Sequence, residues 1–177
     1  LLDVGANADC KPDVLYQFGL LGSLYVEHVY GIQNPKVALM NIGEEEGKGN
    51  LVSQAAYDIM KTAKQYNFVG NVEGFDLFNE KADVIVCDGF TGNVIIKQAE
   101  GIYDLLKKRK VVDPFIDNFN YEFHGGSPIL GVNGAVVVGH GVSNANAIKN
   151  MVKLSKNVAE SMLAEKIKNA FTFAHVG

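Results

Sequence analysis

Three side chains between positions 88 and 93 carry groups that can act together in catalysis: the carboxylate of Asp88, the hydroxyl of Thr91 and the amide of Asn93. They follow an apolar run and precede a helical pattern, which predicts a strand-to-helix turn. Helix capping is one explanation, because Asp88 or Thr91 can accept hydrogen bonds from the first N–H groups of the helix. Capping does not explain Gly89 and Gly92, which indicate a positive φ or the close approach of a ligand. The turn therefore predicts functional roles for Asp88 and Asn93.

A second candidate is the loop Gly47–Asn50, which contains Lys48 and lies between an apolar run and a helical pattern. Free backbone N–H groups and the positive end of a helix favour an anion there, and Lys48 adds a full charge. The loop is not a P-loop, because it is one residue short and lacks the Ser or Thr that would hold magnesium. The alternative is a loop whose lysine pairs with a glutamate at position 44, 45 or 46. Gly47 and Gly49 are candidate phosphate-binding positions.

Two more polar segments are expected at the same edge of the sheet. Asn7 follows the first strand, and His140 lies between two glycines near the end of the chain. A histidine flanked by glycines is poorly shielded and can donate a hydrogen bond or carry a proton. The alternative for the second segment is a turn in which Ser143 or Asn144 caps the final helix.

Cys10 and Cys87 show neither zinc-ligand spacing nor the pattern of a disulfide framework. Cys87 lies within an apolar strand, which indicates a core residue rather than a nucleophile. His28, His124 and His175 show no metal-ligand spacing. The sequence predicts no metal and no cofactor.

The elements that must position these groups alternate between strand and helix, which predicts a doubly wound α/β fold with a mostly parallel sheet. Asn133 and Gly134 lie between two apolar runs and favour a tight two-residue hairpin, so a mixed sheet is expected. One helix is predicted to start at Pro12, and another to present Leu51, Ala55 and Ile59 on one face. Strands are predicted at 1–5, 36–42, 67–72 and 83–87, and a further helix at 95–106.

The last predicted element is a helix over residues 144–171, interrupted in its apolar stripe at Ser155. Its length of about 28 residues corresponds to ~42 Å. Such a helix either packs on its own sheet or extends across a dimer interface.

Composition is typical of an ordinary globular domain, with 47% hydrophobic residues and a formal net charge of −4, and together with the alternating pattern it predicts a single α/β domain over residues 1–177. The negative charge argues against a nucleic-acid partner. No apolar run is long enough to span a bilayer, and no signal-peptide pattern is present, which indicates a cytoplasmic protein. The chain opens inside a strand without an initiator Met, so we expect it to be the C-terminal portion of a longer polypeptide.

Six segments, in this order along almost the whole chain, resemble the bacterial PlsX-type phosphate acyltransferases of phospholipid synthesis. The chain departs from the family pattern at Phe75, where a polar residue such as arginine is expected, and at His124, where tyrosine is common. The stretch between Gly101 and Gly125 is also short. The matching segments are Leu2–Asn7, Asn41–Glu45 with Lys48–Asn50, Phe68–Gly74, Cys87–Val94, His124–Gly131 and Gly139–Gly141.

The resemblance implies a three-layer α/β/α fold of the Rossmann-like or isopropylmalate dehydrogenase-like type. It also implies the transfer of a long-chain fatty acyl group from acyl carrier protein to inorganic phosphate, giving acyl phosphate. Phosphate dianion is already a nucleophile, so the site must mainly hold it and stabilise a developing oxyanion. We expect Lys48 to bind phosphate or the developing charge and Asn93 to donate to a thioester or phosphate oxygen. Asp88 would orient one of them, and Asn7, Gly47, Gly49, Thr91 and His140 would line the site.

The partners implied are acyl carrier protein, inorganic phosphate and a second copy in a homodimer. The basic run Lys107–Lys110 can steer an acidic carrier protein, rest on an anionic membrane at its inner face, or simply end a helix favourably. Two other functions stay open. The nearer is a phosphate acetyltransferase acting on acetyl coenzyme A, and the farther is a non-catalytic phosphate- or nucleotide-binding module.

Overall fold

The computed structural model describes residues 1–141 and 143–174. The chain forms two compact units, Leu1–Val94 and Ile95–Gly177. Each unit has its own secondary structure and is described by itself below. The expectation that the 177 residues form a single domain stays a prediction.

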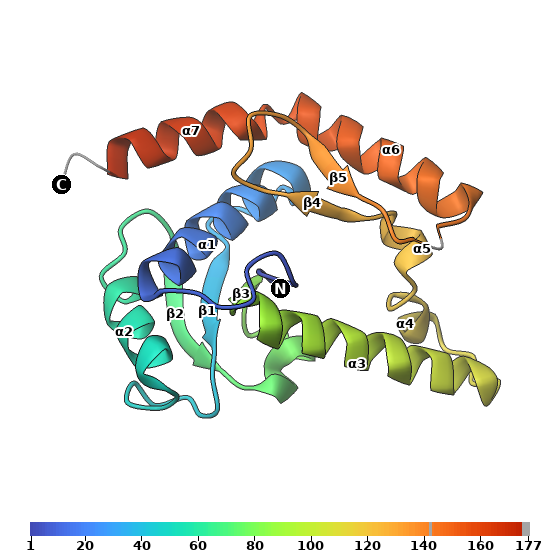
Figure 1. Cartoon of the computed structure of the whole chain (residues 1–177), viewed down its shortest axis with the longest axis horizontal. Coiled ribbons are helices and arrows are strands. Elements are labelled where there is room, and N and C mark those ends of the chain that lie inside the picture. The colour runs from blue at the N-terminus through green and yellow to red at the C-terminus, as the bar shows by residue number, and fades with distance from the viewer. Residues whose placement is uncertain (142, 175–177) are drawn as a thin grey trace. The chain divides into compact units, whose positions relative to one another are not determined.

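The first unit is built on a three-stranded parallel sheet in the order β2-β1-β3 (Figure 1). Leu2 adds to the free side of β3 through a parallel bridge to Val86. All four segments therefore run in the same direction and end at the same edge. The strands are β1 (Lys36–Met40), β2 (Asn67–Val72) and β3 (Val84–Val86).

Helices flank the sheet because its central strand is apolar on both faces, as strands of parallel sheets usually are. Ala38 packs with Val72 and Ile85, and Leu77 from the short helix η2 (Gly74–Phe78) covers them. Helix α1 contacts β1 and β3, and α2 contacts β2 and α1. The sheet lies between helical layers, and the predicted α/β/α fold class is confirmed. The two longer helices are α1 (Pro12–Tyr25) and α2 (Leu51–Met60).

Helix α1 starts at Pro12 as predicted, and a single π-helical turn (Val26–Tyr30) extends it to Gly31. Gly31 ends this helix in the left-handed region, at φ 76°.

The predicted buried face of α2 was wrong. Leu51 is 84% exposed, whereas Ala56, Tyr57 and Met60 are buried. The helix is oriented so that Leu51 and Ile59 stay exposed, while Tyr57 and Met60 are buried. These two side chains remove more apolar surface there, and Tyr57 packs edge-on against Phe68 of β2.

Helix α3 (Gly89–Lys108) begins in the first unit and continues into the second. In the second unit, β4 and β5 pair antiparallel as a two-stranded sheet of their own, so the predicted mixed sheet is wrong. The predicted two-residue hairpin is wrong as well, because the last ladder pair is Ile129 with Val136 and six residues lie between them. Helix α6 contacts β5 and covers this hairpin. The elements are α4 (Pro114–Asp117), α5 (Tyr121–His124), β4 (Ser127–Ile129), β5 (Val136–Val138), α6 (Ala145–Glu160) and α7 (Leu163–Ala174).

The predicted single helix over 144–171 is wrong, because a turn at Ser161 and Met162 divides it into α6 and α7. The Ser155 hydroxyl donates to the carbonyl of Met151 at 2.9 Å, one turn earlier, so the helix passes through it. Met162 takes a left-handed φ of 52° and ends α6. The Asn144 side chain accepts from the N–H of Ala147 at 3.0 Å, which confirms the predicted cap. None of the helices in the described ranges is both long and apolar enough for a bilayer span.

Candidate active site

The carboxyl ends of the parallel strands bring three predicted segments to one edge of the first unit. β1 leads into the loop that carries Lys48, and β3 leads into the turn with Asp88 and Asn93. The segment that carries Asn7 follows the bridge of Leu2 with β3. Because β1 and the N-terminal segment both neighbour β3, these three connections start side by side. Open α/β sheets bind ligands at such an edge.

Asp3 organises the first connection. Its buried carboxylate accepts from the backbone N–H groups of Gly5 at 2.9 Å, Ala6 at 3.0 Å and Asn7 at 2.6 Å. The side-chain amide of Asn7 also donates to it at 3.0 Å. Burial by itself raises the pKa of Asp3, but these four hydrogen bonds outweigh burial and hold its pKa below the usual value. The amides of this loop therefore face the chain's own carboxylate.

Sequence reasoning missed Asp3, although the residue belongs to the recognised segment Leu2–Asn7. The signal was a short acidic side chain two residues before Gly5, where aspartate commonly hydrogen-bonds the backbone N–H groups that follow it. The predicted residue Asn7 consequently contacts Asp3.

Asp88 caps α3, which agrees with the helix-capping explanation of this turn. Its Oδ1 accepts from the N–H of Thr91 at 2.7 Å. Both glycines of the turn are helical and neither has a positive φ, so that part of the prediction was wrong. The close approach that they permit is made by the chain itself: a Cβ at Gly89 would lie 2.7 Å from the carbonyl oxygen of Asn7, and one at Gly92 would overlap that of Asp3.

Asn93 lies in the first turns of α3 and is exposed. Its side-chain amide donates to the carbonyl of Val4 at 3.2 Å, so it lies beside the loop that Asp3 organises. A side-chain amide carries two N–H donors. Among residues 1–141 and 143–174 the structure gives this group one acceptor, which leaves a second donor for a ligand oxygen.

Lys48 lies on the loop after β1, and its side chain is about half exposed. Its Nζ is 3.9 Å from the carboxylate of Glu45, so the alternative in which Lys48 pairs with an acidic neighbour is what the structure shows. An exposed ion pair of this kind contributes little energy, and an incoming anion can replace it.

Two loop glycines differ in their surroundings. Gly49 has φ 89°, and a Cβ there would overlap the side-chain oxygen of Asn41. Gly47 has open space around it. Asn50 then caps α2 by accepting from the N–H of Ser53 at 2.8 Å. The close packing at Gly49 holds the end of the loop against Asn41.

His140 lies in the second unit and lines a cavity of about 410 Å³ with His124, Glu100 and Ser127 among others. Its backbone carbonyl accepts from the hydroxyl of Ser143 at 2.6 Å. The membership of His140 in one site with Lys48 and Asn93 stays a prediction.

Both cysteines, Cys10 and Cys87, are buried. Cys87 donates to the carbonyl of Asp3 at 3.3 Å, and burial raises its pKa to about 12, so it stays protonated near neutral pH. The predicted core role of Cys87 is confirmed. Across the described residues, no cluster of three His, Cys, Asp or Glu side chains could hold a metal ion.

The basic run Lys107–Lys110 lies at the C-terminal end of α3. This agrees with the simplest of the three explanations, in which cations favour a helix end. Lys107 pairs with Asp117 at 3.1 Å and lies 5.5 Å from the ring centre of Tyr103. Lys107 and Lys108 occupy the last turn, where cations interact favourably with the helix dipole.

Comparison with known proteins agrees with the resemblance seen in the motifs. Phosphate acyltransferase from Dictyoglomus thermophilum is 46% identical over an alignment of 186 residues, which covers 94% of this chain and 55% of the relative. The phosphate acyltransferase of Halothermothrix orenii is 43% identical, with 95% of this chain and 56% of the relative covered. The chain spans about half the length of the curated relatives that it matches. The model of the family described as Fatty acid synthesis protein matches residues 1–110. Since this match covers more than half of the 177 residues, the chain belongs to the fatty acid synthesis protein family.

Proposed function

We propose that the whole protein transfers a fatty acyl group from acyl carrier protein to inorganic phosphate. The observation that carries this proposal is that Lys48 and Asn93 follow neighbouring parallel strands, β1 and β3, at the edge where α/β sheets bind ligands. The relatives at 41–46% identity bear the name phosphate acyltransferase, which supports the same reaction class.

In the proposed reaction, Lys48 holds the phosphate dianion. A phosphate oxygen attacks the carbonyl carbon of the thioester, and the carbonyl oxygen becomes an oxyanion. The carbon–sulfur bond then breaks, and the departing thiolate takes the proton of the phosphate. The products are acyl phosphate and the free thiol of the carrier protein. No base is needed, because the dianion is already a nucleophile, and catalysis depends on positioning and on charge stabilisation.

Asn93 supplies the donor for the oxyanion in this scheme. Its exposed amide and its contact with Val4 support that role. Asp88 and Thr91 hold the first turn of α3, so they orient Asn93 through the helix. Asn7 braces the neighbouring loop through Asp3, and the amides of Gly47 and Gly49 lie on either side of Lys48. A role for His140 in phosphate binding is part of the proposal and rests on the motif resemblance at Gly139–Gly141 alone.

The test is thiol release from acyl carrier protein by the whole protein, with and without phosphate. We expect release that depends on phosphate and yields acyl phosphate, and a loss on the order of 10²-fold in Lys48→Ala. Lys64→Ala is the control, since this lysine is exposed and lies outside the strand-end loops. Full activity of a folded Lys48→Ala protein would contradict the proposal, and activity with acetyl coenzyme A alone would redirect it to an acetyltransferase.

We also propose that the protein acts in the cytoplasm and that the basic run makes peripheral contact with an anionic membrane at its inner face. Lys108, Arg109 and Lys110 are exposed, and Val112 nearby is 92% exposed. Basic and apolar side chains side by side suit such a surface. Vesicles of anionic phospholipid should co-sediment the protein, and reversal of these charges should abolish binding. Unchanged binding would leave the run as a contact for the acidic carrier protein.

A homodimer is proposed as well. Ile148 and Val152 are exposed and lie one turn apart on α6. Light scattering after size exclusion should give the mass of two chains for the natural protein and of one chain for Val152→Glu. Lys153→Glu is the matched control on the same helix, and a dimer that survives Val152→Glu would exclude this face.

A further inference from the structure

The loop that carries Lys48 has no regular secondary structure, yet its backbone is tied to the sheet by a buried side chain. We infer that Asn71 is a positioning residue, whose amide holds the Lys48 loop in the conformation needed to bind phosphate. This inference rests on the proposed function, because it assigns Lys48 the phosphate. It concerns a residue of β2 that lies outside the loop itself.

The side chain of Asn71 is well placed for this role. The residue is 4% exposed and lies one position before the end of β2. Its amide nitrogen donates to the carbonyls of Glu45 at 3.0 Å and Glu44 at 3.5 Å. Its amide oxygen accepts from the side chain of Asn41 at 3.1 Å. Both ends of one buried amide are therefore used to fix the loop.

Asn41 continues this connection to Lys48. It directly follows β1, and its side-chain nitrogen also donates to the carbonyl of Lys48 at 3.1 Å. Its side-chain oxygen accepts from the N–H of Ile42 at 2.8 Å. In the sheet, Leu39 of β1 pairs with Asn71 of β2. The backbone of Lys48 is thus linked to the paired strands through the side chains of Asn41 and Asn71.

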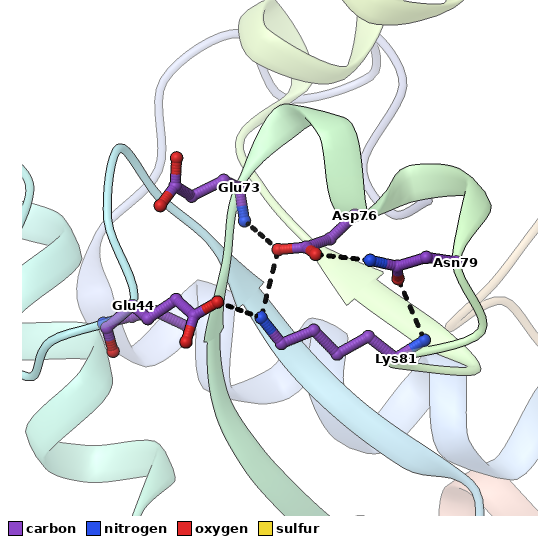
Figure 2. Close-up of polar contacts among 6 residues, drawn as sticks. Glu44, Glu73, Asp76, Asn79 and Lys81 are labelled. Atoms are coloured by element: carbon purple, nitrogen blue, oxygen red, sulfur yellow. Dashed lines mark hydrogen bonds and ion pairs between the residues drawn. The ribbon is translucent and has the colours of Figure 1, made fainter.

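A group of ion pairs and hydrogen bonds around Lys81 holds the loop at a second point, the side chain of Glu44 (Figure 2). Lys81 pairs with the carboxylate of Glu44 at 2.5 Å and with that of Asp76 at 3.2 Å. The Asp76 side chain is 2% exposed and is fixed by the N–H of Glu73 at 2.8 Å and the amide of Asn79 at 2.6 Å. Lys81 therefore connects the exposed carboxylate of Glu44 to the buried carboxylate of Asp76, which accepts further hydrogen bonds.

The three consecutive glutamates of the loop have different partners. Glu44 pairs with Lys81, Glu46 pairs with Lys61 at 3.3 Å, and Glu45 alone approaches Lys48. Glu44 is thus held by the connection between η2 and β3, and Glu46 by the C-terminal end of α2. Exposed ion pairs contribute little to stability, whereas a buried amide whose hydrogen bonds are all made is costly to disrupt. Asn71 is accordingly the stronger of the ties.

Fixing the backbone matters because the lysine side chain is long and flexible. A displacement of about 1 Å in a catalytic geometry can lower the rate on the order of 10²-fold. The hydrogen bonds of Asn71 and Asn41 fix the backbone position of Lys48. The bound phosphate then fixes the position of its ammonium group.

The decisive variant is Asn71→Asp in the whole protein. It keeps the acceptor toward Asn41 but replaces the donor by a carboxylate oxygen that faces two carbonyls. We expect kcat/KM for phosphate to fall about 10- to 100-fold, while the KM for acyl carrier protein stays unchanged. Amide hydrogen exchange should rise in the loop 42–50 and not in β1. Asn150→Asp is the matched control, because its amide also donates to a backbone carbonyl, that of Glu122 at 2.9 Å, but in the second unit.

A double-mutant cycle with Lys48→Ala separates positioning from general damage. If Asn71 acts through Lys48, Asn71→Asp should have little further effect on phosphate kinetics in the Lys48→Ala background. Multiplicative effects of the two changes would overturn the inference and leave the proposed function intact. Full activity of Lys48→Ala alone would instead remove the proposed function.

A milder variant covers the case in which Asn71→Asp does not fold. Glu44→Gln removes only the exposed end of the Lys81 pair, and we expect a two- to tenfold rise in the KM for phosphate that disappears in the Lys48→Ala background. Glu160→Gln, which removes the exposed pair with Lys156 on α6, should leave that KM unchanged. The inference would be overturned if Glu44→Gln left the KM for phosphate unchanged and Asn71→Asp was folded and fully active. It would also be overturned if that KM was unchanged and Asn71→Asp did not fold.

Discussion

Helix α3 meets the N-terminal segment so closely that a Cβ on Gly92 would overlap the carbonyl oxygen of Asp3 and lie 3.1 Å from the thiol of Cys87. Asp3 is the residue whose carboxylate shapes the next loop, and Asn93 is the next residue of the helix. The backbone contact at Gly92 therefore fixes the proposed oxyanion donor against the loop that it faces. Substitution at this position tests whether the packing is as close as described.

Gly92→Ala should destabilise the protein by about 1–3 kcal/mol, because the added methyl group must displace backbone. Gly101→Ala is a matched control on the same helix, since a Cβ there meets nothing within 4 Å. The control should stabilise by about 0.5–1 kcal/mol through the higher helix propensity of alanine. Urea unfolding of the whole protein measures both changes. Equal effects of the two substitutions would refute the close approach.

Gly49→Ala should destabilise the Lys48 loop. A left-handed conformation costs an alanine about 1–2 kcal/mol, and its Cβ would overlap the side chain of Asn41. Gly47→Ala is two residues away, in open space and without a positive φ. It should therefore change the free energy of unfolding by a few tenths of a kcal/mol at most, as surface substitutions usually do. A comparison of their unfolding midpoints decides the point, and an equally stable Gly49→Ala protein would contradict the described loop conformation.

Asp3 should make the protein sensitive to acid. Its pKa is held below the usual 3.8 in the folded state, so its contribution to stability is present above that value and is lost as the pH falls through the folded pKa. Asp3→Asn should be less stable than the natural protein at neutral pH and should lose less stability between about pH 4 and pH 2. Asp9→Asn, at an exposed aspartate of the same segment, should behave like the natural protein. Parallel pH profiles for natural protein and Asp3→Asn would disprove this role.

Asn93→Ala should lower kcat on the order of 10²- to 10³-fold, because it removes a donor to the developing oxyanion. The KM for acyl carrier protein should change little. Gln98→Ala is the control, as an exposed amide further along the same helix. Single-turnover thiol release with saturating phosphate gives the rate of the chemical step. If Asn93→Ala keeps the natural rate in a folded protein, the amide is not the oxyanion donor.

Local sequence patterns predicted the elements of the first unit well. The strand at 67–72 and the helix that starts at Pro12 agree with the structure residue by residue, because apolar periodicity and proline act on the neighbouring backbone. The predicted buried face of α2 and the predicted single helix over 144–171 were wrong. Which side of a helix is buried depends on the surface opposite it, and the apolar stripe does not show that α6 ends where Met162 takes a left-handed φ.

The sequence by itself determined which residues follow the strand ends, and it therefore identified Lys48, Asp88 and Asn93 as candidates. Only the tertiary structure decided which polar groups form hydrogen bonds within the chain. The amide of Asn93 reaches a carbonyl 89 positions away, and that of Asn71 reaches one 26 positions away. Such pairs depend on strand order and on the turn of each helix, which arise from packing across the whole unit. Local patterns encode neither, so the positioning role of Asn71 emerges only from the folded chain.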